Sequence, residues 1–318
     1  MKQRVLITGA AGNLGNLLAQ HLKDNDAFGL NLLFHKKDIA ENLKANPNIN
    51  SFKADLADRQ SLYTSLLGVD TVVHFAGVLF KANPEKFLPV TNVRYFDNLL
   101  EVAIEQKVKR IILISFPHVE GETTPQHPAL GSLDKNPISM HAKTRLEEEK
   151  LLFEKCRKHN IEAVSLRVGM VYGKGILMID AAQWFARHYL LGIWKKPTFI
   201  HLISKEDLVQ SVESAIHKSG IQGIYHIGDE GVQTLQEFLD VITVHKGNHK
   251  PWRMPVWMIM MAAGIFELFS ALSGARSPLT RDFVKIGMVS YYGDTSRMQQ
   301  ELLPKLKYPT FKDGLETF

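Results

Sequence analysis

The feature that most constrains the fold is a glycine loop near the start of the chain. Residues 4–15 read RVLITGAAGNLG, so a short apolar strand runs into three glycines and a leucine-rich helical pattern follows. Gly9 permits a tight turn, Gly12 lets the backbone approach a pyrophosphate, and Gly15 lets the helix pack closely on the strand. The helix N-terminus then faces the anion with its N–H groups and dipole. The sequence therefore predicts a dinucleotide-binding unit, with a purely structural turn as the alternative.

Strand and helix patterns alternate through the first two thirds of the chain. After the first strand, we expect strands at 30–35, 71–76, 110–115, 163–168 and 223–228, a short strand that ends at 52–55, and helices at 59–67, 92–106 and 140–159. Apolar strands separated by helices are typical of a parallel sheet covered on both faces. We therefore predict an α/β fold, a doubly wound parallel sheet (Rossmann) with a smaller C-terminal substrate-binding lobe. The expected division is 1–170, rejoined by 200–228, for NAD(P) binding, and 171–199 with 229–318 for the lobe.

Composition limits the classes of partner. The chain holds 38 lysines and arginines against 33 acidic residues, a net charge of +5. Basic residues occur in scattered pairs such as Lys36-Lys37, so we expect no nucleic-acid partner. The single cysteine, Cys156, excludes an intramolecular disulfide framework, and its helical pattern predicts a buried small side chain. Since no signal-peptide pattern precedes the first strand, we expect a cytoplasmic protein, and we expect no metal site.

An apolar, methionine-rich stretch covers residues 256–269. It is fourteen residues long and Glu267 interrupts it, so it is short for a bilayer span. A core or pocket-lining helix is the first interpretation, and its methionines would suit a bulky apolar substrate. An interfacial membrane helix with peripheral membrane contact and a true span are the alternatives.

With these motifs, the chain resembles the extended short-chain dehydrogenase/reductases, the family of NAD-dependent epimerases and dehydratases. It is also similar to their sterol-dehydrogenase and dihydroflavonol-reductase relatives. The motifs that carry the resemblance are Thr8-Gly9-x-x-Gly12-x-x-Gly15, Asp55-Leu56, Asp70-x-x-x-His74-x-Ala76-Gly77, Asn92, residues 167–173, residues 225–228 and Asp294-Thr295-Ser296-Arg297.

The resemblance implies a set of cofactor contacts and a homodimer. The dimer would form through the helices at 92–106 and 140–159. Asp55 and Leu56 would contact the adenine, and Val168 would pass near the nicotinamide. The other implied contacts, at the glycine loop, the ribose and the pyrophosphate, are Thr8, Gly9, Gly12, Asn13, Leu14, Gly15, Phe75, Ala76, Gly77, Asn92 and Lys143.

The choice of cofactor depends on the end of the second strand. Folds that prefer NAD place a carboxylate there for the ribose 2′-hydroxyl, whereas cations accommodate a 2′-phosphate. This chain has His35-Lys36-Lys37 at that point, with Asp38 one step later. Lys36 can offer a point charge to phosphate. We therefore predict NADP, with NAD as the second choice, bound by His35 and Lys36; two solvated lysines are the alternative.

The catalytic motif departs from the family pattern. Family members usually carry a Ser, and a Tyr four residues before a Lys. Here Ser139 stands four residues before Lys143, and serine is a much weaker acid than phenol. By its spacing to Gly121, Phe116 replaces the usual serine, and Ser115 precedes it. The usual proton relay is therefore missing.

Three alternatives could supply the missing proton transfer. Lys143 could be the acid/base itself, as in tyrosine-lacking reductases, with its pKa lowered near a cationic nicotinamide. His118 could supply a proton from the loop after the fifth strand, or a tyrosine from elsewhere could enter the site. His141 points elsewhere on the helix than Lys143.

The leading expectation is an NAD(P)-dependent oxidoreductase or epimerase-like protein. It would reduce a carbonyl or an activated double bond of a hydrophobic small molecule by lysine-centred chemistry. Lys143 would be assisted by His118, Ser139 or Ser115. The alternative is a catalytically silent dinucleotide-binding redox sensor or regulatory protein, which the loss of both Ser and Tyr favours.

Overall fold

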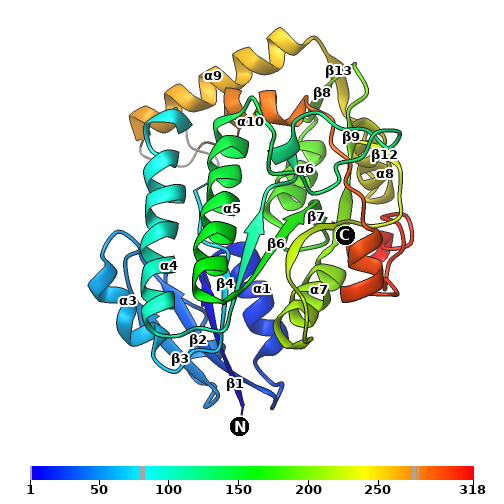
Figure 1. The fold of residues 1–318 in the computed structure, drawn as a ribbon. Helices are drawn as coiled ribbons and strands as arrows, with labels where there is room; N and C mark the ends of the chain where they lie inside the picture. The colour runs from blue at the N-terminus through cyan, green and yellow to red at the C-terminus, as the bar shows by residue number, and fades with distance from the viewer. Residues whose placement is uncertain (1, 79–82, 274–276, 278) are drawn as a thin grey trace.

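A parallel sheet of seven strands forms the centre of the protein (Figure 1). The structure is a computed structural model that describes residues 2–78, 83–273, 277 and 279–318. The strands lie in the order β11-β6-β5-β4-β1-β2-β3, and each pairs in parallel with its neighbours. They are β1 (Gln3–Thr8), β2 (Phe28–Phe34), β3 (Ile49–Lys53), β4 (Thr71–His74), β5 (Arg110–Ser115), β6 (Glu162–Val168) and β11 (Gly223–Ile227). This order confirms the predicted doubly wound α/β fold.

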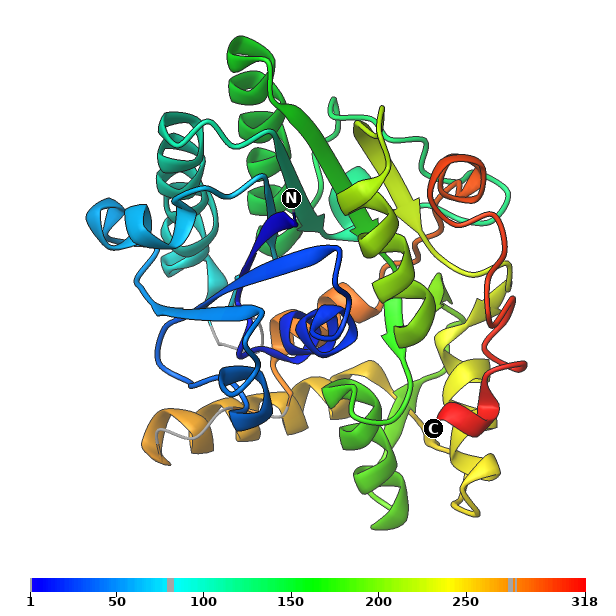
Figure 2. The same cartoon turned by 90° about the horizontal axis from the view of Figure 1, so that it is seen from below.

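Helices cover both faces of this sheet. They are α1 (Asn13–Leu22), α2 (Glu41–Lys44), α3 (Arg59–Leu66), α4 (Tyr95–Glu105), α5 (Met140–His159) and α7 (Lys205–His217). Because side chains alternate along a strand, Val5 and Ile7 of β1 pack in one cluster with α1 and α7. Leu6 packs in a second cluster with α3, α4 and α5, and this cluster buries Cys156 as predicted. Figure 2 shows α1 and α7 on one side of the sheet and α4 and α5 on the other.

The remaining elements gather toward the carboxyl ends of the central strands (Figure 1). Three two-stranded pairs, β10-β7, β12-β9 and β13-β8, stand apart from the central sheet. The elements are β7 (Met170–Tyr172), α6 (Leu177–Arg187), β8 (Gly192–Trp194), β9 (Phe199–Ile200), β10 (Leu202–Ser204), β12 (Gln233–Thr234), α8 (Leu235–His245), β13 (Trp252–Met254), α9 (Val256–Ser273) and α10 (Arg281–Gly287). Short helical turns are η1 (Pro84–Lys86), η2 (Pro89–Arg94), η3 (Pro117–Glu120), η4 (Met298–Leu302) and η5 (Leu315–Thr317). The division into two domains stays a prediction.

The apolar stretch at 256–269 forms a helix that is longer and more exposed than the core interpretation allows. It extends to Ser273 as α9, has a mean hydropathy of 1.7, and is long and apolar enough to cross a membrane by length and composition alone. Within it only Ile259 and Ala263 are buried. The first interpretation, a core helix, is therefore wrong, because composition shows how apolar a helix is but not whether other elements cover it.

Candidate functional site

The glycine loop has the close packing that the sequence predicts. Gly9 has φ +67°, and a Cβ on it would lie 3.0 Å from the Ala76 backbone nitrogen. A Cβ on Gly15 would overlap the Gly9 carbonyl, since it would lie 2.9 Å from the carbonyl carbon and closer still to the oxygen. Gly12 donates its N–H to the Gly9 oxygen at 2.8 Å and forms the N-cap of α1 without a side-chain cap. The first turn of α1 thus has the form that anions bind.

Gly15→Ala is expected to weaken dinucleotide binding by about a hundredfold. The added methyl group meets backbone atoms, so the loop and α1 must move apart. Dinucleotide affinity measured by calorimetry checks this. Gly264→Ala is the matched control, because that helical glycine has ordinary space for a Cβ, 3.9 Å from the nearest atom of Arg281. Equal affinities for the two variants would contradict the expectation.

Thr8 joins the first and fourth strands. Its hydroxyl lies 2.8 Å from Nδ1 of His74, and both side chains are buried. Burial, aided by the Arg145 charge, lowers the pKa of His74 to about 3. The ring is therefore neutral at pH 7 and shares one hydrogen bond with the Thr8 hydroxyl at Nδ1. The Thr8 side chain thus links β1 to β4, so the cofactor contact implied for Thr8 would come from its backbone.

Asn13 connects the glycine loop to the substrate side. It donates from Nδ2 to the Gly175 carbonyl at 2.7 Å and accepts the Leu177 N–H at 3.1 Å. Its side chain therefore fixes the start of α6 beside the start of α1. The other residues of the implied cofactor set lie at the carboxyl ends of the strands: Leu14 and Phe75 half-buried on one core cluster, Leu56 on the other, Val168 buried at the end of β6, Ala76 half-buried and Gly77 exposed.

The predicted adenosine end contains charged side chains of both signs. Nδ1 of His35 lies 3.7 Å from the Asp55 carboxylate, and both are half-exposed. Lys36 is exposed. Asp38 is engaged elsewhere, because its carboxylate accepts from Lys44 at 2.6 Å and from the Ile39 N–H at 2.9 Å. These contacts hold the pKa of Asp38 below its usual value. The carboxylate that would bind a ribose 2′-hydroxyl is thus turned toward α2.

The structure places Lys143 on the solvent face of α5. Lys143, Glu147 and Lys150 form an exposed stripe at helical spacing, opposite the face that packs on the sheet. Ser139 is the N-cap of this helix, and its hydroxyl accepts the Ala142 N–H at 3.2 Å. These two residues therefore do not meet as a proton relay, and the structure gives no support to the catalytic roles predicted for them.

The inward face of the same helix carries His141 and Arg145, again four residues apart. His141 is buried, with Nε2 3.5 Å from the carboxylate of Asp282 on α10. Burial, together with the Arg145 charge, lowers the pKa of His141 to about 4. Arg145 approaches the Ala76 carbonyl at 3.4 Å, and a Cβ on Gly77 would overlap its guanidinium. The end of β4 and the inward face of α5 therefore meet at this arginine.

A second carboxylate lies beside this pair. Arg145 donates to Glu148 at 2.8 Å, and Glu148 is fully buried. Burial outweighs the Arg145 charge and raises the pKa of Glu148 to about 7. One turn away, Asn92 donates to Thr144 at 3.1 Å. The Asn92 amide nitrogen thus links η2 to α5, and the cofactor contact implied for Asn92 stays a prediction.

Ser115 belongs to a buried ionic network rather than to an open site. Its hydroxyl donates to Glu149, which also accepts from Ser165 at 2.9 Å and from Arg167 at 2.6 Å. Arg167 also donates to Glu120, whose carboxylate lies 3.3 Å from Nε2 of His226. These contacts hold β5, β6, β11 and α5 together, and they occupy the Ser115 hydroxyl.

His118 and Phe116 form an aromatic cluster after β5. The centroid of the His118 ring lies 4.8 Å from that of Phe116 and 4.6 Å from that of Tyr291. The Nε2–H of His118 donates to the Val289 carbonyl at 3.1 Å. Burial lowers the pKa of His118 to about 4 despite that hydrogen bond. Tyr291 accepts the Met170 N–H at 2.7 Å and donates to the His201 carbonyl. The His118 ring and the Tyr291 hydroxyl are thus occupied by contacts within the fold, which argues against either of them as the missing proton donor.

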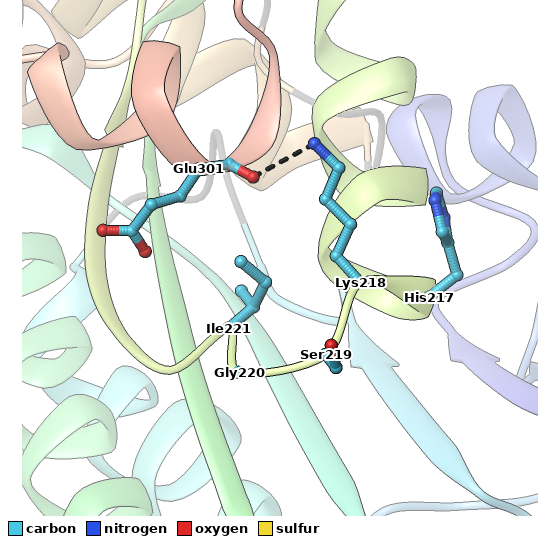
Figure 3. A pocket seen from close by; sticks show the side chains of 6 residues that line it. All are labelled: His217, Lys218, Ser219, Gly220, Ile221 and Glu301. Carbon is cyan, nitrogen blue, oxygen red and sulfur yellow. Dashed lines mark hydrogen bonds between the residues drawn. The ribbon is translucent and has the colours of Figure 1, made fainter.

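Two further observations concern metal binding and a second pocket. Among the described residues, no group of three or more His, Cys, Asp and Glu side chains is placed to hold a metal. Figure 3 shows a polar pocket before β11, where Lys218 donates to the Glu301 carbonyl at 3.1 Å. This pocket lies at the amino end of the strand, at the edge of the sheet opposite the glycine loop. It is lined by His217, Lys218, Ser219, Gly220, Ile221 and Glu301.

Known proteins share this architecture. Residues 5–193 match the model of the NAD dependent epimerase/dehydratase family. The chain is 27% identical to a uronate dehydrogenase of Pseudomonas putida, over 69% of this chain and 73% of that protein. It is 24% identical to the mouse sterol-4-alpha-carboxylate 3-dehydrogenase, decarboxylating, over 84% and 75%. The dTDP-glucose 4,6-dehydratase of Streptomyces venezuelae, solved with NAD and TYD bound, superposes with a TM-score of 0.78 at 19% identity, covering 99% of this chain and 95% of that one.

Proposed function

Because the chain belongs to the NAD-dependent epimerase/dehydratase family, we propose that it is a nicotinamide-dependent oxidoreductase with His141 as its proton acceptor. It would interconvert a secondary alcohol and a ketone on an apolar small molecule. The observation that carries this proposal is the pair His141 and Arg145, four residues apart on the inward face of α5. That spacing is the one in which the family usually presents its Tyr and Lys.

The residues present fit a dinucleotide. Gly9, Gly12 and Gly15 leave no room for side chains where the loop meets α1, and the first turn of α1 suits a pyrophosphate. Arg145 lies against the carbonyl of Ala76 at the end of β4, where its remaining donors suit ribose hydroxyls. When bound, the cofactor supplies the hydride acceptor or donor.

His141 is suited to accept a proton. Its low pKa leaves the imidazole neutral at pH 7, so it can take the proton of a substrate hydroxyl as the carbonyl forms. Asp282, 3.5 Å away, would stabilise the resulting imidazolium and orient the ring. Reduction needs the imidazolium at the start, and burial disfavours that form. We therefore propose alcohol oxidation, for which the resting ring is in the required neutral form, in place of the reduction that the sequence suggested.

An aromatic side chain supports an apolar substrate. Phe116 stands after β5, where the family usually has a serine that polarises the substrate oxygen. Its ring offers no hydrogen bond to a sugar hydroxyl. One similar protein is named as a sterol dehydrogenase, which agrees with this class. A uronate or a nucleotide sugar is the competing class, suggested by the other relatives.

A catalytically silent dinucleotide-binding protein is the second candidate. The observation that favours it is Phe116, which packs on His118 and replaces the polarising hydroxyl. The two functions separate in one experiment. The purified protein is incubated with NAD or NADP and a panel of sterols, other apolar secondary alcohols, uronates and nucleotide sugars, while the absorbance of reduced nicotinamide is recorded. Turnover supports the oxidoreductase, binding without turnover supports the silent protein, and a lack of binding contradicts both.

The preferred cofactor is proposed to be NADP. Asp38 is held by Lys44, whereas Lys36 is exposed after β2. Lys36→Ala is expected to weaken NADP binding about tenfold and to leave NAD binding unchanged, because only NADP carries the 2′-phosphate. Titration of both cofactors checks this, with the exposed Lys150→Ala as the control. An equal loss for both cofactors would refute the role of Lys36.

A further inference from the structure

An uncovered apolar stripe runs along the whole of α9. Its members recur every three or four residues, so they share one face of the helix. Each is between 55% and 80% exposed. They are Trp257, Met261, Ile265, Leu268, Phe269 and Leu272. Exposed apolar surface of this extent on a soluble domain marks an interaction site.

The opposite face fixes α9 to the domain. Ile259 and Ala263 are buried there, and the helix packs on β8 and α10. Its one acidic residue, Glu267, is turned inward and accepts from Arg281 at 2.8 Å. The exposed stripe therefore carries no charge. The 18 residues span about 27 Å along the domain surface, and crossing a bilayer would require this packing to be lost.

Aromatic and cationic side chains border the stripe. The ring centroids of Phe185 of α6 and Phe266 of α9 lie 6.3 Å apart, so the two helices adjoin, and the exposed Trp184 precedes Phe185 in α6. At the start of α9, Trp194 of β8 pairs with Met254 of β13, so the exposed Lys195 and Lys196 follow β8 where α9 follows β13. Tryptophan and lysine are the residues that gather at the boundary between lipid and water.

We propose that α9 docks the protein on an anionic lipid surface, with its apolar stripe in the interface and Lys195 and Lys196 at the headgroups. The helix would lie in the plane of the membrane without crossing it. The net charge of +5 favours such a surface. A second copy of this chain would need an apolar partner face but no cationic end and no bordering tryptophans. This inference is independent of the proposed catalysis.

Vesicle flotation of the full-length protein tests the proposal. We expect it to float with vesicles of phosphatidylcholine and phosphatidylglycerol, and less with phosphatidylcholine alone. Ile265→Ser with Leu268→Ser should reduce binding by about tenfold or more. The matched control is Leu67→Ser with Leu130→Ser, two leucines that are 71% and 76% exposed on other elements. Thermal unfolding of each variant confirms that it is folded.

The charge variant and the oligomeric state distinguish docking on an anionic lipid surface from pairing with a second copy of the chain. Lys195→Glu with Lys196→Glu should weaken binding to the anionic vesicles and leave binding to neutral vesicles unchanged. Failure of the unaltered protein to float with either vesicle overturns the proposal, as does equal flotation of the stripe variant. A dimer in lipid-free solution that the stripe variant converts to a monomer also overturns it, because a second copy then covers the helix.

Discussion

Replacing Arg167 with methionine is expected to lower the free energy of unfolding by about 3–5 kcal/mol. The Arg167 side chain is 0% exposed and donates to Glu149, Glu120 and the Ser132 carbonyl. Methionine of similar length fills the space but leaves two buried carboxylates without their cation. Denaturant unfolding at pH 7 measures the loss. Arg59→Met is the control, because its pair with Glu105 is solvent-exposed and is expected to contribute at most about 1 kcal/mol.

The pH dependence identifies the cause of that loss. Burial raises the pKa of Glu120, but the adjacent His226 ring, 3.3 Å away, and the Arg167 charge outweigh it and lower that pKa to about 2. Stability from this ionised carboxylate is present above the unfolded pKa, near 4.5, and is lost as pH falls toward 2. In the variant Glu120 takes up a proton more readily. The deficit should therefore be largest near pH 7 and shrink as the pH falls and Glu120 becomes protonated in the folded variant. A constant deficit would indicate a packing defect instead.

Local patterns predicted the central sheet and the glycine loop. The inner strands are apolar along most of their length because helices cover both faces, so their positions follow from local sequence patterns. The edge strand β3, INSFK, is largely exposed, and its position was predicted less well. Gly9 and Gly15 are required by contacts within a short stretch of chain and with Ala76. Such features need little knowledge of distant packing. The orientation of α5 does, and the structure turns the predicted Lys143 to the solvent face of that helix.

The buried face of α5 mixes apolar and polar residues, so hydrophobic spacing alone does not orient the catalytic motif. The buried residues are His141, Ala142, Thr144, Leu146, Glu148, Glu149, Leu152 and Cys156, and Lys143 lies on the opposite face. Two basic residues of α5, Lys143 and Arg145, could therefore each correspond to the lysine of the family's Tyr and Lys pair. The available signal was Glu149, a carboxylate on the same helix that needs a buried cation. That cation is Arg167, a residue of another strand, so the buried face of α5 depends on a contact distant in the sequence.

His141→Gln is expected to reduce alcohol oxidation by about a hundredfold to ten-thousandfold, the usual contribution of a general base. Glutamine keeps the polar volume but cannot accept a proton. Dinucleotide affinity should change little, because the cofactor contacts come from the glycine loop and Arg145. Lys143→Met is the matched control on the same helix and should leave the rate unchanged, since that side chain faces solvent. Steady-state rates and cofactor titrations give both quantities.

The pH profile separates a base from a packing residue. Because burial and the Arg145 charge lower the pKa of His141 to about 4, the imidazole is neutral across the neutral range. Oxidation should therefore stay level from neutral pH downward and decline only as pH approaches 4, where the ring is already protonated and cannot accept the substrate proton. Asp282→Asn removes the carboxylate that stabilises the imidazolium and should lower the rate without abolishing cofactor binding. If Lys143→Met abolishes oxidation while His141→Gln preserves it, the lysine-centred chemistry is correct and the solvent face of α5 must turn inward during catalysis.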